Sequence, residues 1–249
     1  MAVIWQKTVH GKIYEVRAAG QTRRLYRDGV LHSQYNPNKA LTGNVWDLLS
    51  LPCFFLAPEK IHRVLVLGVG GGAVVQQISR WFPDTHIAGM ELDKTHIAIA
   101  RKFFHLRGKH INLIHADAIE WVKRYRGPPF DIVIEDLFGE QGGEPVRVIA
   151  ANKSWLEHLN RLMTPHAALI MNFVEARDLR ASAAFTEPAI KQRYKMAYRF
   201  MIPPYENQIG VFLSQPCKKK EWRRRIAGLC DLDRQFQSIQ HKYRIRKLF

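Results

Sequence analysis

A run of glycines and a following acidic residue are the first residues in this sequence whose types and spacing could perform chemistry. Gly68, Gly70, Gly71 and Gly72 directly follow one apolar run, and Glu91 ends a second one. Glycines tolerate positive φ and lack a Cβ, so a ligand can lie against the backbone of such a turn. A carboxylate at the end of the next strand can accept hydrogen bonds from both hydroxyls of a ribose. The combination indicates a nucleoside site.

The residues around this turn predict the elements that position it. Residues 64–67 are continuously apolar, which is typical of a parallel strand buried on both faces. Apolar residues recur at helical spacing over 73–82, and a second apolar strand follows over 86–90. The N-terminus of the helix then offers free N–H groups to the ligand. The pattern Gly-x-Gly-x-x-Ala from Gly68 also fits a dinucleotide site, so the stretch alone leaves a nicotinamide cofactor and S-adenosylmethionine both open.

Two more acidic residues stand where later strands end. A third strand is predicted over 111–115 and Asp117 follows it, while a fourth strand over 130–136 ends at Asp136. The carboxyl ends of parallel strands meet at one edge of a sheet, so we expect these acids to share a crevice with Glu91. Asp117 is placed to accept hydrogen bonds from the exocyclic amine of adenine.

The remaining patterns predict further strands and helices. Alternating residues indicate an antiparallel β-meander before the main sheet, over 12–17, 23–27 and 30–33. The other expected elements are a strand over 167–174, a hairpin near 196–201 and 209–214, a loop over 137–145, and helices near 45–49, 95–106, 119–126, 150–163, 218–229 and 233–242. Alternation of strands and helices predicts an α/β fold with a parallel sheet.

Composition excludes several classes of protein. The 249 residues suffice for one large domain, or a core domain with a small appendage. Cys53, Cys217 and Cys230 are scattered, which argues against a disulfide framework or structural zinc and suits a reduced, cytoplasmic protein. No metal site is expected. The most apolar run, 48–57, is too short for a membrane span.

The formal net charge of +16 is concentrated near the C-terminus. Residues 61–175 carry 13 Lys and Arg against 12 Asp and Glu, whereas residues 176–249 carry 17 against 6, a net charge of +11. Such a field attracts polyanions such as RNA, an anionic membrane surface or an acidic protein, and repels a polycation. A solvated basic surface that only aids solubility is an equally open interpretation.

Several of these motifs together resemble a known family. The runs VLVLGVGGG, MELD, HADA and FDIVIEDLFG, preceded by LYRDGVLHSQYN, resemble the spermidine synthase-like branch of the class I S-adenosylmethionine-dependent methyltransferases. The resemblance spans roughly residues 10–215. It implies a Rossmann-like α/β fold, with a mostly parallel seven-stranded sheet, an antiparallel terminal hairpin and a small N-terminal β-meander.

The resemblance also implies a division of the chain and a set of site residues. The division is 1–58 for the meander and linker helix, 59–215 for an S-adenosylmethionine-binding Rossmann-like domain, and 216–249 for a basic helical extension. The implied roles are the cofactor loop for Gly68, Gly70, Gly71 and Gly72, the ribose for Glu91, the adenine for Asp117 and Ala118, and the reacting sulfonium for Asp136. A dinucleotide dehydrogenase is thereby disfavoured.

Two departures from the family pattern bear on the acceptor. Gly71 stands where aminopropyltransferases carry an aspartate, and Gly139 stands where the second acid of their Asp-Ser-Ser-Asp segment belongs. Those enzymes use carboxylates to hold a cationic polyamine and to relieve one nitrogen of its proton. Loss of two acids, in a chain of net charge +16, weakens both functions.

Three hypotheses remain, with the acceptor unknown and a homodimer left open. The leading one is a methyltransferase that uses S-adenosylmethionine, in which Asp136 orients or deprotonates the nucleophile and residues 137–144 shape its pocket. The second is aminopropyl transfer to a polyamine from decarboxylated S-adenosylmethionine. In that case other acids replace the missing ones, the candidates being Asp47, Glu135, Glu140 and Glu144. The third is a non-catalytic module that binds RNA or an acidic partner through the basic C-terminal third.

Overall fold

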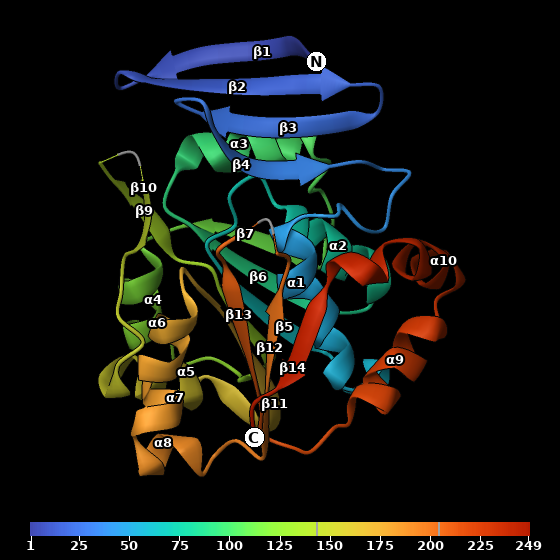
Figure 1. Cartoon of the computed structure of the whole chain (residues 1–249). Coiled ribbons are helices and arrows are strands. Elements are labelled where there is room, and N and C mark those ends of the chain that lie inside the picture. Colours follow the sequence, from blue (N-terminus) through green and yellow to red (C-terminus); the bar gives the residue numbers. More distant parts are fainter. Residues whose placement is uncertain (143, 204) are drawn as a thin grey trace.

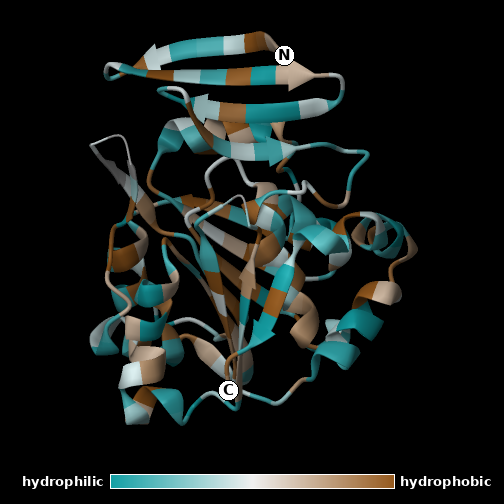
Figure 2. Cartoon of the chain, viewed as in Figure 1, coloured by the Kyte–Doolittle hydropathy of each residue, from teal (hydrophilic) through white to brown (hydrophobic). Residues whose placement is uncertain are grey.

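A central β-sheet covered on both faces by helices forms the body of the protein, and a small antiparallel sheet lies across one end of it (Figure 1). The computed structural model describes residues 1–142, 144–203 and 205–249, and the side chains of residues 140, 141 and 144 also lie outside the described part. Figure 2 shows hydrophobic residues concentrated along the central strands, as the two-sided burial of a parallel sheet requires.

The small sheet is the predicted β-meander with one additional strand. Its strands are β1 (Ala2–Val9), β2 (Lys12–Ala19), β3 (Thr22–Arg27) and β4 (Val30–Tyr35), in that spatial order. β1 was not among the predicted strands. His10 and Gly11 both have positive φ, at 49° and 77°, so a two-residue turn pairs β1 with β2.

The central sheet has the predicted Rossmann-like architecture. Its strand order is β14-β12-β13-β11-β8-β5-β6-β7. The parallel strands are β5 (Arg63–Leu67), β6 (His86–Glu91), β7 (Ile111–His115), β8 (Phe130–Glu135) and β11 (Met163–Phe173). The predicted antiparallel hairpin consists of β12 (Met196–Met201) and β13 (Gln208–Leu213).

An eighth strand, β14 (Arg244–Lys247), extends the predicted seven-stranded sheet by pairing antiparallel with β12. Its sequence, RIRK, has a single apolar residue, so the pattern indicates a charge run more than a strand. The prediction of a loop over 137–145 is wrong. That segment forms a hairpin of β9 (Phe138–Gln141) and β10 (Glu144–Arg147).

Two hydrophobic clusters lie on opposite faces of the central sheet. Successive side chains of β5 point to opposite faces, so Val64 and Val66 belong to one cluster while Leu65 and Leu67 belong to the other. The first face is covered by α1 (Val45–Ser50), α2 (Ala73–Trp81), α9 (Lys219–Ala227) and α10 (Cys230–Ile239). The second is covered by α4 (Ala118–Arg124), α5 (Lys153–Arg161), α6 (Ala176–Ala181), α7 (Ala183–Thr186) and α8 (Pro188–Lys191).

The remaining helices are α3 (Lys94–Phe103), which lies beneath the meander, and the short 3₁₀ helices Leu51–Phe55, Pro58–Lys60 and Gln240–Lys242. The C-terminal segment packs into the first cluster: Trp222 is 1% exposed and donates its indole N–H to the carbonyl of Leu51 at 2.9 Å. Across the described residues, no helix combines the length and apolarity that a membrane crossing requires.

Candidate active site

A cleft of about 1380 Å³ lies between the meander and the carboxyl ends of the central strands. Six of the predicted site residues line it together, namely Gly68, Gly70, Glu91, Asp117, Ala118 and Asp136. They come from the ends of β5, β6, β7 and β8, which are neighbours in the sheet. The expected convergence of the three acids is therefore present in the fold.

Two glycines of the loop allow a close approach of backbone to backbone. Gly68 and Gly70 have φ of 86° and 55°, a region that residues with a Cβ rarely occupy. A Cβ on Gly68 would overlap the carbonyl of Asp136, and one on Gly70 would lie 3.0 Å from the carbonyl oxygen of His32. The loop is thus held between β8 and the meander strand β4.

Gly71 and Gly72 are enclosed by packing and do not line the cleft. A Cβ on Gly71 would lie 2.6 Å from the Cβ of Ser33, whose hydroxyl accepts a hydrogen bond from the Ala73 N–H at 3.1 Å. Gly72 has φ of 90° at the N-cap of α2, and a Cβ there would overlap Leu106. The meander therefore occupies the space into which a longer side chain at position 71 would project.

Glu91 is fixed by the backbone of the glycine loop. Its carboxylate accepts hydrogen bonds from the N–H groups of Gly70 at 2.7 Å, Val69 at 3.1 Å and Asp93 at 2.9 Å. Burial alone would raise the pKa of this carboxyl, but the His96 side chain and the backbone donors outweigh it and lower that pKa. Glu91 is therefore an ionised acceptor at the edge of the cleft.

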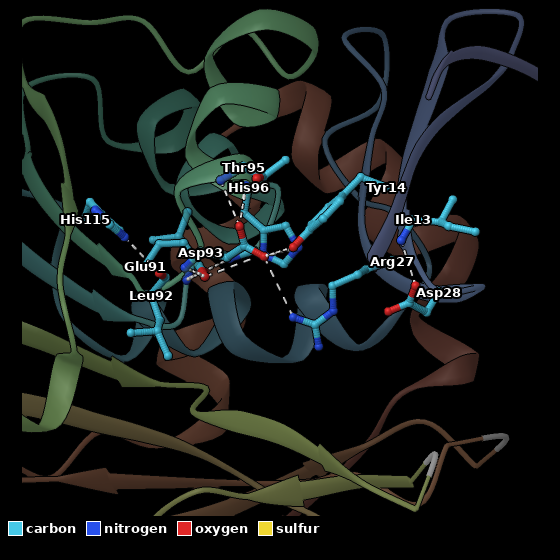
Figure 3. A network of polar contacts seen from close by, with 12 residues as sticks. Ile13, Tyr14, Arg27, Asp28, Glu91, Leu92, Asp93, Thr95, His96 and His115 are labelled. Atoms are coloured by element: carbon cyan, nitrogen blue, oxygen red, sulfur yellow. Dashed lines mark hydrogen bonds and ion pairs between the residues drawn. The ribbon is translucent and has the colours of Figure 1, made fainter. Parts of the chain in front are cut away.

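A polar network connects Glu91 to the meander (Figure 3). The Tyr14 hydroxyl donates to Asp93 at 2.5 Å, and Asp93 also caps α3 by accepting from the Thr95 N–H at 2.8 Å. The ring of His96 lies between two carboxylates, with nitrogens 3.5 Å from Glu91 and 3.8 Å from Asp93. Arg27 approaches Asp93 at 3.9 Å. These contacts hold the meander over the end of the cleft that contains Glu91.

Asp117 is the N-cap of α4. Its Oδ1 accepts hydrogen bonds from the N–H groups of Ile119 at 2.8 Å and Glu120 at 3.2 Å. Within the described residues both bonds of the carboxylate use this one oxygen, so Oδ2 has capacity for a further donor such as an exocyclic amine. Capping alone also explains an aspartate here, and the two roles are compatible.

Asp136 follows β8, and its carboxyl group has a raised pKa. Burial raises its pKa to about 6, against the lowering effects of a hydrogen bond from Asn172 and of the Arg147 charge. The Asn172 amide donates to Asp136 Oδ1 at 2.8 Å and accepts from the Asn207 amide at 3.0 Å. A carboxylate with this pKa can accept a proton near neutral pH.

Asn172 and Asn207 are the functional candidates that the sequence analysis missed. Asn172 is the one amide in the apolar run 167–174, and a polar residue within a buried strand is a signal that could have identified it. Asn207 precedes β13 in a segment without a comparable signal. Tyr205, which also lines the cleft, donates to Asn44, so uncharged polar groups surround this part of it.

Two of the acids proposed as replacements for the missing family carboxylates cannot act in the cleft, and that prediction is wrong for them. Asp47 is 0% exposed and accepts hydrogen bonds from Thr42, Gly43, Gln77 and Tyr243. Glu135 is also 0% exposed and forms an ion pair with Arg147 at 2.7 Å. The side chains of Glu140 and Glu144 lie outside the described residues.

The polar groups of the cleft fit an adenosyl ligand better than a metal ion. The carboxylates of Glu91 and Asp117 line the cleft together with Gly68 and Gly70. They can accept hydrogen bonds from hydroxyl and amine groups. Among the residues that the structure describes, no three His, Cys, Asp or Glu are grouped so that they could hold a metal.

Comparisons with known proteins agree with this geometry. A family model described as "Spermine/spermidine synthase domain" matches residues 48–223. "Polyamine aminopropyltransferase 2" from Caldanaerobacter subterraneus is 25% identical over 213 residues, which are 84% of this chain and 68% of that protein. The human "eEF1A lysine and N-terminal methyltransferase" is 26% identical over 138 residues, which are 49% of this chain and 19% of that protein.

A solved structure shows the same fold over nearly the whole chain. The crystal structure of a probable spermidine synthase from Corynebacterium glutamicum matches with a TM-score of 0.73 and 17% sequence identity. The match covers 97% of this chain and 95% of that one, so it includes the meander as well as the central sheet.

Proposed function

The chain belongs to the spermine/spermidine synthase family, and from that premise we propose that it transfers an aminopropyl group from decarboxylated S-adenosylmethionine to an amine. The observation that carries the proposal is Asp136, a carboxylate with a pKa of about 6 in the same cleft as Glu91 and Asp117. We favour aminopropyl transfer over the methyl transfer expected from the sequence, because the relative from Caldanaerobacter subterraneus is named a polyamine aminopropyltransferase.

Each residue of the cleft would have a separate role in such a reaction. Glu91 would accept hydrogen bonds from the ribose, Asp117 would accept one from the adenine amine, and the backbone of Gly70 would border the donor. The donor, when bound, supplies a carbon made electrophilic by a positively charged sulfur. An amine is protonated at neutral pH, so Asp136 would accept its proton before attack.

Methyl transfer from S-adenosylmethionine is the second candidate, and a specific observation favours it. Ser33 and Leu25 fill the space beside Gly71, so no acid can face an aminopropyl ammonium from that position. Gly139 likewise supplies no charge, and the amides of Asn172 and Asn207 are neutral. These features suit a less cationic acceptor, and the human relative is named a methyltransferase.

Product analysis distinguishes the two reactions. The purified protein is incubated with each donor and with putrescine, a cell extract or neither, and products are separated and identified by mass. Aminopropyl adducts formed only with the decarboxylated donor are expected. Methyl adducts alone would establish the second candidate, and tight donor binding without any adduct would contradict both.

A further inference from the structure

The cleft extends well beyond the space that an adenosyl donor and a small amine require. Its volume of about 1380 Å³ exceeds the roughly 300–1000 Å³ of ordinary small-molecule sites. The additional part lies between α3 and the strands β1 and β2, and we call it the outer groove. The residues that define it are Trp5, Lys7, Lys12, Lys94, Lys102 and Phe103. None of them has a role in the proposed transfer.

One face of the meander packs on one face of α3 along this groove: Tyr14 and Ile99 are buried in the contact, and Trp5, Val9 and Phe103 pack against them. Trp5, Lys7 and Val9 alternate along β1, so their side chains share a face. Lys7 pairs with Tyr14 and Val9 with Lys12 across the β1–β2 ladder, which adds the β2 residues to that face. On α3, residues 95, 99, 102 and 103 recur at helical spacing. Figure 1 shows α3 beneath the strands of the meander.

The outer groove is positively charged. Lys7, Lys12, Lys94 and Lys102 are all exposed and line it. Asp93 lines the cleft next to the groove, and its carboxylate is already engaged by Tyr14, His96 and the first turn of α3. The groove therefore attracts an anion, in contrast to the donor end with Glu91, Asp117 and Asp136.

Aromatic rings interleave with these lysines. The rings of Trp5 and Phe103 are 5.8 Å apart, and the Lys102 ammonium lies 5.1 Å from the Phe103 ring centroid. Trp5 and Phe103 are half-buried, so part of each ring remains accessible. Basic residues that follow a backbone, combined with aromatic rings on which bases stack, are the features of sites for single-stranded nucleic acid.

We propose that the outer groove binds single-stranded RNA, with phosphates on the lysines and bases on Trp5 and Phe103. The four exposed lysines of the groove support a polyanionic partner, and the aromatic rings favour a strand with flat bases over an acidic peptide. The proposal is independent of which group the enzyme transfers, because the groove lies outside the set of strand-end acids.

Fluorescence anisotropy with a labelled single-stranded oligoribonucleotide tests the proposal in the full-length protein. The double variant Lys7→Ala/Lys102→Ala removes two phosphate contacts, and each contributes about 0.7 to the slope of log affinity against log salt. The slope should therefore fall by about 1.4. Trp5→Ala should weaken binding about tenfold by removing one stacking surface, and Trp5→Phe should retain most of the affinity.

A matched control removes the same charge from another surface. Lys219→Ala/Lys220→Ala changes two exposed lysines of α9, which do not line the cleft. The control should leave the salt slope nearly unchanged. Equal losses from both double variants would overturn the proposal in favour of diffuse attraction. Tighter binding of polyglutamate than of RNA would overturn it in favour of an acidic peptide. Thermal unfolding and donor titration of each variant identify effects of misfolding.

Discussion

Asp136 is the residue on which the proposed chemistry depends most directly. We predict that Asp136→Asn lowers the rate of group transfer by roughly 10²- to 10⁴-fold, the usual contribution of a general base. Donor affinity should change little, because in the proposed reaction Glu91 and Asp117, not Asp136, would hold the donor. Single-turnover kinetics and calorimetric titration measure the two quantities.

Asp131→Asn is the matched control for this variant. It makes the same chemical change within β8, the strand that Asp136 follows, where Asp131 accepts hydrogen bonds from the His62 and Arg63 N–H groups. Transfer should survive in that protein even if its stability falls. Retention of the full rate by Asp136→Asn would remove Asp136 from the mechanism.

The pH dependence of the reaction reports the ionisation of Asp136. A base must be deprotonated to act, so kcat/KM should rise with pH through about 6, the pKa to which burial raises Asp136. The Asn172 hydrogen bond lowers that pKa, so Asn172→Ala should move the acidic limb to higher pH. The exposed Asn112 provides the control, and Asn112→Ala should leave the limb in place. An identical limb in all three proteins would show that another group titrates there.

The contact between the meander and the glycine loop explains one of the departures from the family pattern. Gly71→Asp should destabilise the fold by about 1–3 kcal/mol, because its Cβ would lie 2.6 Å from the Cβ of Ser33 in a packed site. Gly139→Asp is the matched variant, since its Cβ would meet only the side chain of Val148, at 3.0 Å. Thermal unfolding should show a clear loss for the first and a small one for the second. Equal stability of the two variants would mean that Ser33 can move away from position 71 at little cost in free energy.

The C-terminal helices belong to the same hydrophobic cluster as α1 and α2. Trp222 stacks on Phe55 with ring centroids 5.7 Å apart, and its indole N–H is bonded to Leu51. Trp222→Ala should therefore cost about 3–5 kcal/mol of unfolding free energy. Arg224→Ala, an exposed change on the same helix, should cost little. Denaturant titration measures both, and a small loss for Trp222→Ala would indicate that α9 is only loosely attached.

For the molecule as a whole, the sequence predicted what short apolar runs and their end residues determine. The strands around the glycine loop and the acids Glu91, Asp117 and Asp136 follow from local patterns, and the structure places all three acids in one cleft. The division at residues 58 and 215 stays a prediction. Truncation after residue 215 tests it, and the burial of Trp222 leads us to expect a destabilised product.

What the sequence did not predict depends on contacts between distant segments. Ser33 lies against Gly71, Arg147 neutralises Glu135, and Tyr243 donates to the buried Asp47. Each pair is brought together only by the completed fold, so spacing along the chain carries no signal for it. Because of their contacts with Arg147 and Tyr243, Glu135 and Asp47 are structural groups and not acids of the cleft.

In the proposed function Glu91, together with the strand-end acids beside it, would hold an adenosyl donor in this cleft. Calorimetric titration of the protein with decarboxylated S-adenosylmethionine tests it most directly. We predict saturable binding at one site per chain, weakened at least tenfold in Glu91→Gln, because hydrogen bonds to a charged acceptor contribute about 1.5–3 kcal/mol. Absence of binding, or equal affinity in the Glu91→Gln protein when its thermal stability is intact, would show that Glu91 does not hold the donor in this cleft.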